Sequence, residues 1–127
     1  MYCAQEDSYG CAIAAVANVC RISYAESKCF FEPAYAINRG YYCRDIIRAF
    51  EQIGYQYKFT SERKYRGNFP HGTIVYVRSD DIPAGHYLAR VDDGWVDSWI
   101  NMLEPGNLNV KVGIRKSLPG RIIWVIY

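Results

Sequence analysis

Apolar residues in the first half of the chain recur with the three- and four-residue spacing of helices. This spacing predicts helices over residues 11–22 and 41–54, and charged residues lie mostly on the opposite face of the second. Gly54 follows the second stripe, where glycine is typical of a helix end. The segment between them has room for a short helix before Pro33. The predicted core-facing positions are Ala12, Ala15, Val16 and Val19 in the first helix, and Ile46, Ile47, Phe50 and Ile53 in the second.

The second half of the chain changes to short alternating or β-branched runs. An Asp-Asp-Gly sequence at residues 92–94 predicts a hairpin between two of these runs. Helices followed by antiparallel strands form an α+β pattern, and we expect one domain over residues 1–127. The predicted strands cover residues 55–60, 72–78, 86–91, 95–99, 109–114 and 121–127.

Composition limits the partners and the compartment. The net charge of +2 is too small to favour nucleic acid or an anionic membrane, and no apolar stretch is long enough to span a bilayer. Five cysteines without regular spacing argue against a disulfide framework, and none has the spacing of a zinc site. The first residues lack the basic and apolar regions of a signal peptide, so we expect a cytoplasmic protein with mostly free thiols.

Two of the cysteines flank the first predicted helix, with Cys11 at its start and Cys20 near its end. A thiol reacts as the thiolate, which the free amides and partial positive charge of a helix N-terminus stabilise at Cys11. Gln5 is the one side-chain amide just upstream that could bind an oxyanion together with the backbone amide of Cys11. The sequence also allows a simpler interpretation, in which Cys11 is a core residue and Gln5 has no chemical role.

A nucleophilic cysteine needs an imidazole beside it, and the chain has two histidines. His71 lies in a turn, where an exposed loop residue is the plain interpretation. His86 begins a predicted strand, a position that holds a catalytic group rigidly, and we favour it. Asp97 lies in the next strand, which is otherwise suited to burial. A carboxylate there needs a partner such as His86, unless it faces water.

The hairpin register decides which residue faces His86. A two-residue turn at 93–94, which turn chemistry favours, sets Asn101 opposite His86 and leaves Asp97 about 13 Å away along the strand. A four-residue loop at 90–93 sets Asp97 opposite His86 and agrees with the burial pattern. The residues therefore leave Asp97 and Asn101 as alternatives for the group that orients His86.

The order of these residues resembles that of the papain-like cysteine peptidases. Gln5, Cys11 at a helix start, His86 and Asp97 follow that order, and the Gln-to-Cys spacing of six residues is that of papain. The segment Asp97-Ser98-Trp99 resembles the Asn-Ser-Trp segment of papain. The chain departs from the family pattern in having alanine after the cysteine and serine after Asp97.

The likeness is closer to the small bacterial and phage domains related to bacteriocin-processing peptidases, which cut leader peptides after a double glycine. Their pattern Q-x-D-x-x-x-C fits Gln5, Asp7 and Cys11. The segment NRGYYCRDIIRAFEQIGYQYKF resembles their second helix and following strand. The segment GHYLARVDDGWVDSW resembles their hairpin from histidine to aspartate.

The resemblance implies a papain-like α+β fold, with the nucleophile at a helix N-terminus packed on an antiparallel sheet. It implies a cysteine peptidase for a protein or peptide substrate, with Cys11 as nucleophile, His86 as base, Asp97 as the orienting group and Gln5 as oxyanion donor. It requires no cofactor and no metal. Two alternatives remain: a papain-fold binding module without turnover, and a phage or toxin effector that acts as a deamidase or acyltransferase.

Overall fold

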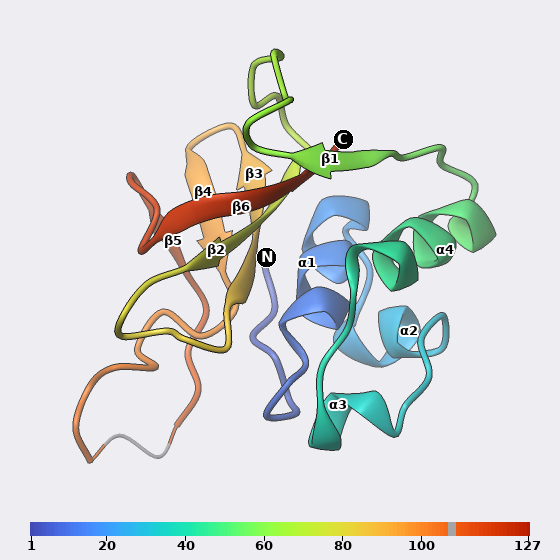
Figure 1. Ribbon diagram of the computed structural model, residues 1–127. Helices are drawn as coiled ribbons and strands as arrows, with labels where there is room; N and C mark the ends of the chain where they lie inside the picture. Colours follow the sequence, from blue (N-terminus) through green and yellow to red (C-terminus); the bar gives the residue numbers. More distant parts are fainter. Residues whose placement is uncertain (107–108) are drawn as a thin grey trace.

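A computed structural model describes residues 1–106 and 109–127, and this part of the chain is an α+β fold, as expected (Figure 1). The helices come first: α1 (Cys11–Cys20), α2 (Tyr24–Lys28), α3 (Tyr35–Asn38) and α4 (Cys43–Ile53). The strands follow: β1 (Phe59–Ser61), β2 (Ile74–Arg78), β3 (His86–Val91), β4 (Gly94–Asp97), β5 (Gly113–Arg115) and β6 (Arg121–Ile126).

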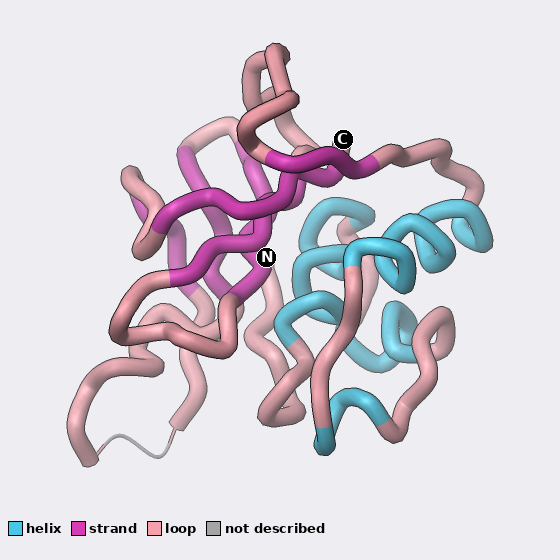
Figure 2. The backbone as a smooth tube through the Cα atoms, viewed as in Figure 1, coloured by secondary structure: helices cyan, strands magenta, loops and turns pink. Residues whose placement is uncertain are grey.

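The helices lie together on one side of a single antiparallel sheet with the strand order β1-β6-β2-β3-β4-β5 (Figure 2). Helix α1 packs against β3 and β4 near the middle of the sheet. Along β3, Tyr87 and Ala89 join the core under the helices, while Leu88 joins a second apolar cluster. Because side chains alternate along a strand, both faces of β3 are covered, which explains why all of its residues except Arg90 are buried.

Helix α1 is buried along most of its length and is built of small side chains. Residues 12–18 are all buried, and four of them are alanines. Small side chains allow the helix backbone to approach the sheet closely. The helix ends at Cys20, two residues before the predicted boundary, because Arg21 adopts a left-handed conformation with φ of 59°. The next N–H, of Ile22, donates back to the carbonyl of Ala17.

Helix α4 agrees closely with the prediction. Ile46 and Phe50 are fully buried, while Ile47 and Ile53 lie half-buried at the edge of the same core. Gly54 ends the helix with φ of 122° and donates its N–H to the carbonyl of Phe50, as expected for a C-terminal glycine. None of the helices within residues 1–106 and 109–127 is long and apolar enough to cross a membrane.

The elements at the sheet edges differ from the prediction. Strand β1 begins at Phe59, not at residue 55, because Tyr57 stacks on Phe50 of α4 with ring centroids 3.7 Å apart. Strand β5 has three residues instead of the predicted 109–114, and all three pair with β4, which is itself short. Helix α2 fills the room before Pro33, while α3 was not predicted. Pairing and packing with distant segments set these boundaries.

The β3–β4 hairpin has a register that neither prediction anticipated. Val91 pairs with Gly94, so the turn consists of residues 92–93 alone. The predicted turn at 93–94 is therefore wrong by one residue, and the predicted loop at 90–93 is also wrong. The physical reason is that Gly94 is needed in the strand: its φ is 149°, and a Cβ there would collide with the carbonyl oxygen of a β5 residue, Arg115.

Gly94→Ala should therefore destabilise the protein by about 3 kcal/mol or more, because it combines backbone strain with a collision between adjacent strands. Gly106→Ala is the matched control, since Gly106 has φ of 71° but a Cβ added there would meet nothing within 4 Å. That change should cost about 1 kcal/mol. Urea denaturation measures both free energies of unfolding. Equal losses in the two variants would show that β4 and β5 do not approach closely at Gly94.

Candidate active site

Cys11 is the first residue of α1, where a tight turn places it. The N–H of Gly10 donates to the carbonyl of Asp7 at 3.0 Å, and the carbonyl of Gly10 accepts the first helical hydrogen bond from Ala14. The residue before Cys11 must be glycine because the hydroxyl of Tyr24 occupies the place of a Cβ. No side chain caps this end of the helix, so the amides of the first turn face the thiol without a competing side-chain acceptor.

The turn before Cys11 is anchored to α2. The carboxylate of Asp7 accepts hydrogen bonds from the hydroxyl of Tyr24 at 2.7 Å and from the ammonium of Lys28 at 2.9 Å. Burial raises the pKa of Asp7, but these two partners outweigh it and the net pKa is lowered. An ionised Asp7 therefore holds the turn in place, and with it the position of the thiol.

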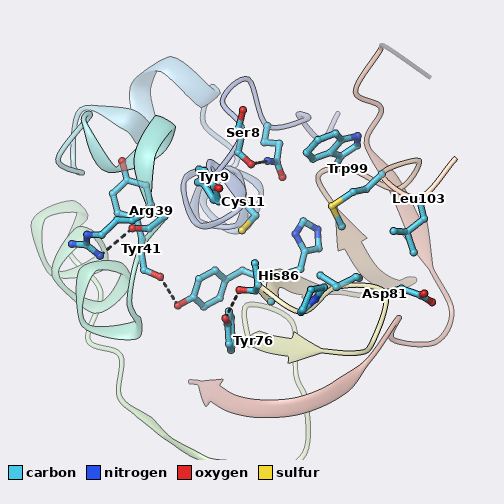
Figure 3. Close-up of a pocket in the computed structure, with 18 residues that line it drawn as sticks. Ser8, Tyr9, Cys11, Arg39, Tyr41, Tyr76, Asp81, His86, Trp99 and Leu103 are labelled. Carbon is cyan, nitrogen blue, oxygen red and sulfur yellow. Dashed lines mark hydrogen bonds between the residues drawn. The ribbon is translucent and has the colours of Figure 1, made fainter. Parts of the chain in front are cut away.

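The imidazole of His86, the first residue of β3, lies beside the thiol of Cys11 in a cavity at the N-terminal end of α1 (Figure 3). Burial alone raises the pKa of Cys11. The hydrogen bond and positive charge of His86, together with the backbone amides of Tyr87 and Ala12, outweigh burial and bring the pKa below 9.0. Cys11 is half-buried and lines the cavity, which is the side from which a substrate would approach.

All five cysteines carry free thiols, but three of the others differ from Cys11 in the direction of the pKa shift. Burial raises the pKa of Cys3 and of Cys20, and it raises the pKa of Cys43 to about 11. The sequence predicts that Cys20 is the poorer nucleophile because it lies at the wrong end of α1. In the structure the cause is loss of water around a thiol that has no cationic partner.

His86 is held by Asp97, the last residue of β4. The imidazole Nε2 lies 2.7 Å from a carboxylate oxygen of Asp97, and the two residues are only 2 % and 1 % exposed. If the hairpin register is continued by one residue, Asp97 lies opposite Leu88. Leu88 is two residues after His86 in β3, so the side chains of Leu88, His86 and Asp97 share one face of the sheet. The side chains of His86 and Asp97 therefore meet diagonally across the hairpin, which is within reach of an imidazole.

The alternative partner, Asn101, uses its side-chain amide for other hydrogen bonds. Its amide donates to the carbonyl of Asn109 at 2.6 Å, and its oxygen accepts the N–H of Lys111 at 3.0 Å. Asn101 thus closes the loop between β4 and β5. His71 is exposed in its turn, as expected, and lies 3.7 Å from the carboxylate of Asp92.

Asp97 has two further partners that sequence reasoning missed. The guanidinium of Arg115, on β5, donates to the second carboxylate oxygen at 2.7 Å, and the backbone N–H of Trp99 donates to the first at 2.9 Å. Arg115 also donates to the carbonyl of Ile100. Nothing in the local sequence marks Arg115, because only the pairing of β5 with β4 brings it beside Asp97.

These contacts set the charges at the site. Burial raises the pKa of Asp97, but the hydrogen bond and charge of His86, followed by Arg115 and the N–H of Trp99, outweigh it and lower the pKa to about 2. Burial lowers the pKa of His86, but the hydrogen bonds to Asp97 and Cys11 outweigh it and raise the pKa. The site therefore favours a thiolate, an imidazolium and a carboxylate in one row.

Gln5 lines the same cavity, but its side-chain amide is already engaged. The amide nitrogen donates to the carbonyls of Asp7 and Ser8 at 2.9 and 3.1 Å, and the amide oxygen accepts the hydroxyl of Ser98 at 2.8 Å. The backbone N–H of Gln5 donates to the carbonyl of Ser98. Gln5 thus ties the turn before α1 to the end of β4, and its role as an oxyanion donor stays a prediction.

The cavity around the thiol has a volume of about 270 Å³. Tyr41 lines one side and Trp99 the opposite side, with Cys11 and His86 between them (Figure 3). The hydroxyl of Tyr76 donates to the carbonyl of Ala84 at 2.6 Å, which fixes the segment before His86. The thiol therefore lies between aromatic side chains on two sides of the cavity.

Within the described ranges, no three histidine, cysteine or acidic side chains come together as metal ligands. No family model, no curated protein and no solved structure matches the chain. The interpretation of the site therefore rests on its own geometry.

Replacing Asp97 by asparagine should lower the pKa of His86 from about 10 towards 6.5, because the carboxylate that favours the imidazolium is removed while burial stays. A pH titration of the imidazole signals by NMR measures this change. The signal of His71, which lies outside the cavity, should be the same in both proteins and serves as the reference. An unchanged His86 titration in Asp97→Asn would mean that Asp97 does not control the imidazole.

Proposed function

We propose that the protein is a cysteine-dependent hydrolase of peptide or amide bonds, with a papain-like arrangement of its site. The observation that carries the proposal is the alignment of three groups from three elements. The Cys11 thiol at the start of α1 lies beside His86 of β3, and His86 is held by the buried carboxylate of Asp97 on β4. A thiol with a lowered pKa beside an oriented imidazole is the constellation of covalent acyl transfer.

The reaction follows from the positions of the protons. Nε2 of His86 is hydrogen-bonded to Asp97, so Nδ1 is the ring nitrogen that can accept the proton of the Cys11 thiol. The thiolate attacks the substrate carbonyl and forms a C–S bond. The imidazolium then gives its proton to the leaving amine as the C–N bond breaks, and a thioester remains on Cys11. Water, deprotonated by His86, attacks the thioester and releases the acid and the thiol.

The charge that develops on the carbonyl oxygen needs hydrogen-bond donors. The N–H of Cys11 belongs to the first turn of α1, whose amides have no partner inside the helix. Gln5 would be the second donor only by sharing or releasing one of its bonds to the carbonyls of Asp7 and Ser8. The turn at residues 5–8 therefore has to adjust slightly when a substrate binds.

The lowered pKa of Cys11 favours turnover over the alternative of a binding module, which has no need of an activated thiol. The same three groups would also release ammonia from a side-chain amide or transfer the acyl group to an amine. The product distinguishes these reactions, because each leaves a different bond.

Iodoacetamide at pH 7 should alkylate Cys11 at least about tenfold faster than Cys29, since the reagent reacts with the thiolate. Cys29 is the matched reference because it is exposed, so a faster reaction at Cys11 cannot come from better access. Mass spectrometry of the digested protein gives the rate at each cysteine. His86→Ala should remove most of the excess, and equal rates at Cys11 and Cys29 in the unmodified protein would disprove thiol activation.

Incubation of the protein with a mixed peptide library, followed by mass spectrometry, should give new peptide termini. Cys11→Ala should give none, because the C–S bond cannot form. Conversion of asparagine or glutamine side chains to acids without new termini would identify a deamidase. If iodoacetamide shows that Cys11 is activated but the protein and its Cys11→Ala variant give identical peptide spectra, peptides are not the substrates.

A further inference from the structure

A second cavity of about 370 Å³ opens beside the candidate active site, at the first turn of α4. Tyr41, Tyr76 and Tyr87 line both this cavity and the one that contains Cys11, so the two cavities are adjacent and share a wall of tyrosines. We call this second cavity the α4 groove; its other lining residues are Tyr42, Cys43, Arg44, Phe59, Arg78 and Trp124.

Among the described residues, two arginines are the only charged side chains that line the α4 groove. In the same part of the chain neither Arg44 nor Arg78 forms an ion pair. Arg78 donates one hydrogen bond, to the carbonyl of Pro83 at 3.1 Å, and both side chains are exposed. The groove therefore has two cationic groups with donors to spare and, within the described ranges, no acid to neutralise them.

Both arginines occupy positions that the fold itself disfavours. Arg44 lies in the first turn of α4, where the partial positive charge of the helix end repels a cation. Arg78 pairs directly with Arg121 across β2 and β6, which places like charges opposite each other. Both arginines line the same groove, and an anionic ligand bound there would offset the electrostatic repulsion at each of them.

The walls of the α4 groove supply apolar surface for the same ligand. Tyr42, Phe59 and Trp124 are 62 %, 40 % and 38 % exposed, and the rings of Phe59 and Trp124 meet edge to face at 5.8 Å. Exposed aromatic side chains beside arginines are typical of surfaces that bind protein segments. The groove thus combines the recognition of a carboxylate with that of an aromatic or aliphatic side chain.

We propose that the α4 groove binds an acidic stretch of the substrate, in which a carboxylate side chain lies between Arg44 and Arg78 and an apolar neighbour packs on Trp124. This inference rests on the proposed function and names its substrate class. The stretch belongs to the acyl half of the substrate. Figure 3 shows Tyr41 and Trp99 on opposite sides of Cys11, with His86 on the Trp99 side. Because His86 gives its proton to the leaving half, we place that half on the Trp99 side and the acyl half on the Tyr41 side.

Peptidyl chloromethyl ketones test the proposal, because they alkylate the thiol only after the peptide has bound on the acyl side. One series carries glutamate, glutamine or lysine at the second, third or fourth residue from the ketone. At one of these positions the glutamate peptide should label Cys11 about tenfold faster than the glutamine peptide, as expected for a charge-assisted contact. The lysine peptide should be slower still.

Arg44→Gln should reduce the preference for glutamate to about threefold or less. The double variant Arg44→Gln, Arg78→Lys should keep part of this remaining preference, because the lysine keeps the positive charge at position 78. Arg48→Gln is the matched control, since Arg48 lies on the same helix, pairs with Asp45 and is not part of the groove. Arg44 is exposed and forms no ion pair in the described ranges, so circular dichroism should be unchanged.

Iodoacetamide separates the two hypotheses, since it reacts at Cys11 without using the groove. Rapid iodoacetamide labelling with no preference for glutamate at any position would overturn the α4 groove proposal and leave the hydrolase intact. A glutamate preference that stays at about tenfold in both Arg44→Gln and Arg78→Gln would also overturn it. Slow iodoacetamide labelling would instead disprove the activated thiol, on which both proposals rest.

Discussion

The contact between His86 and Asp97 is the interaction on which the arrangement of the site depends. Both side chains are almost completely buried. Removing two charges from water costs solvation free energy, and a single contact between them does not recover all of it. The surrounding structure offsets this cost, because the carboxylate also accepts bonds from the N–H of Trp99 and the guanidinium of Arg115. Apolar residues of similar volume would stabilise such a site as well or better. Stability alone therefore does not account for the buried pair, and the proposed hydrolase gives it a role.

Packing of α1 against β3 brings the thiol to this pair. The alanines of α1 let the helix lie close to the middle of the sheet, and β3 presents His86 at its first position. The turn before α1 is fixed from two sides, by the bonds of Asp7 to α2 and by the bond of Gln5 to Ser98 beyond β4. Cys11 and His86 thus belong to different layers of the fold but are held by one connected set of bonds.

The sequence was informative where a local pattern decides the structure. The stripe of α4, the start of α1 at Cys11 and the bounds of β3 follow from periodicity and from glycine positions. It was misleading at the hairpin, because Gly94 serves the contact with β5 and not the turn. Arg115 and the carbonyl partners of Gln5 were out of reach, since the first depends on strand pairing and the second on the exact conformation of a turn.

The central claim is that the thiol of Cys11 ionises more readily because His86 is beside it. The difference in thiolate absorbance between the protein and its Cys11→Ser variant, followed against pH, isolates the titration of this one group. We predict a midpoint below 9.0. When the same two proteins are compared with His86→Ala added to each, the midpoint should move upward. A midpoint at or above 9.0 that does not depend on His86 would contradict the account.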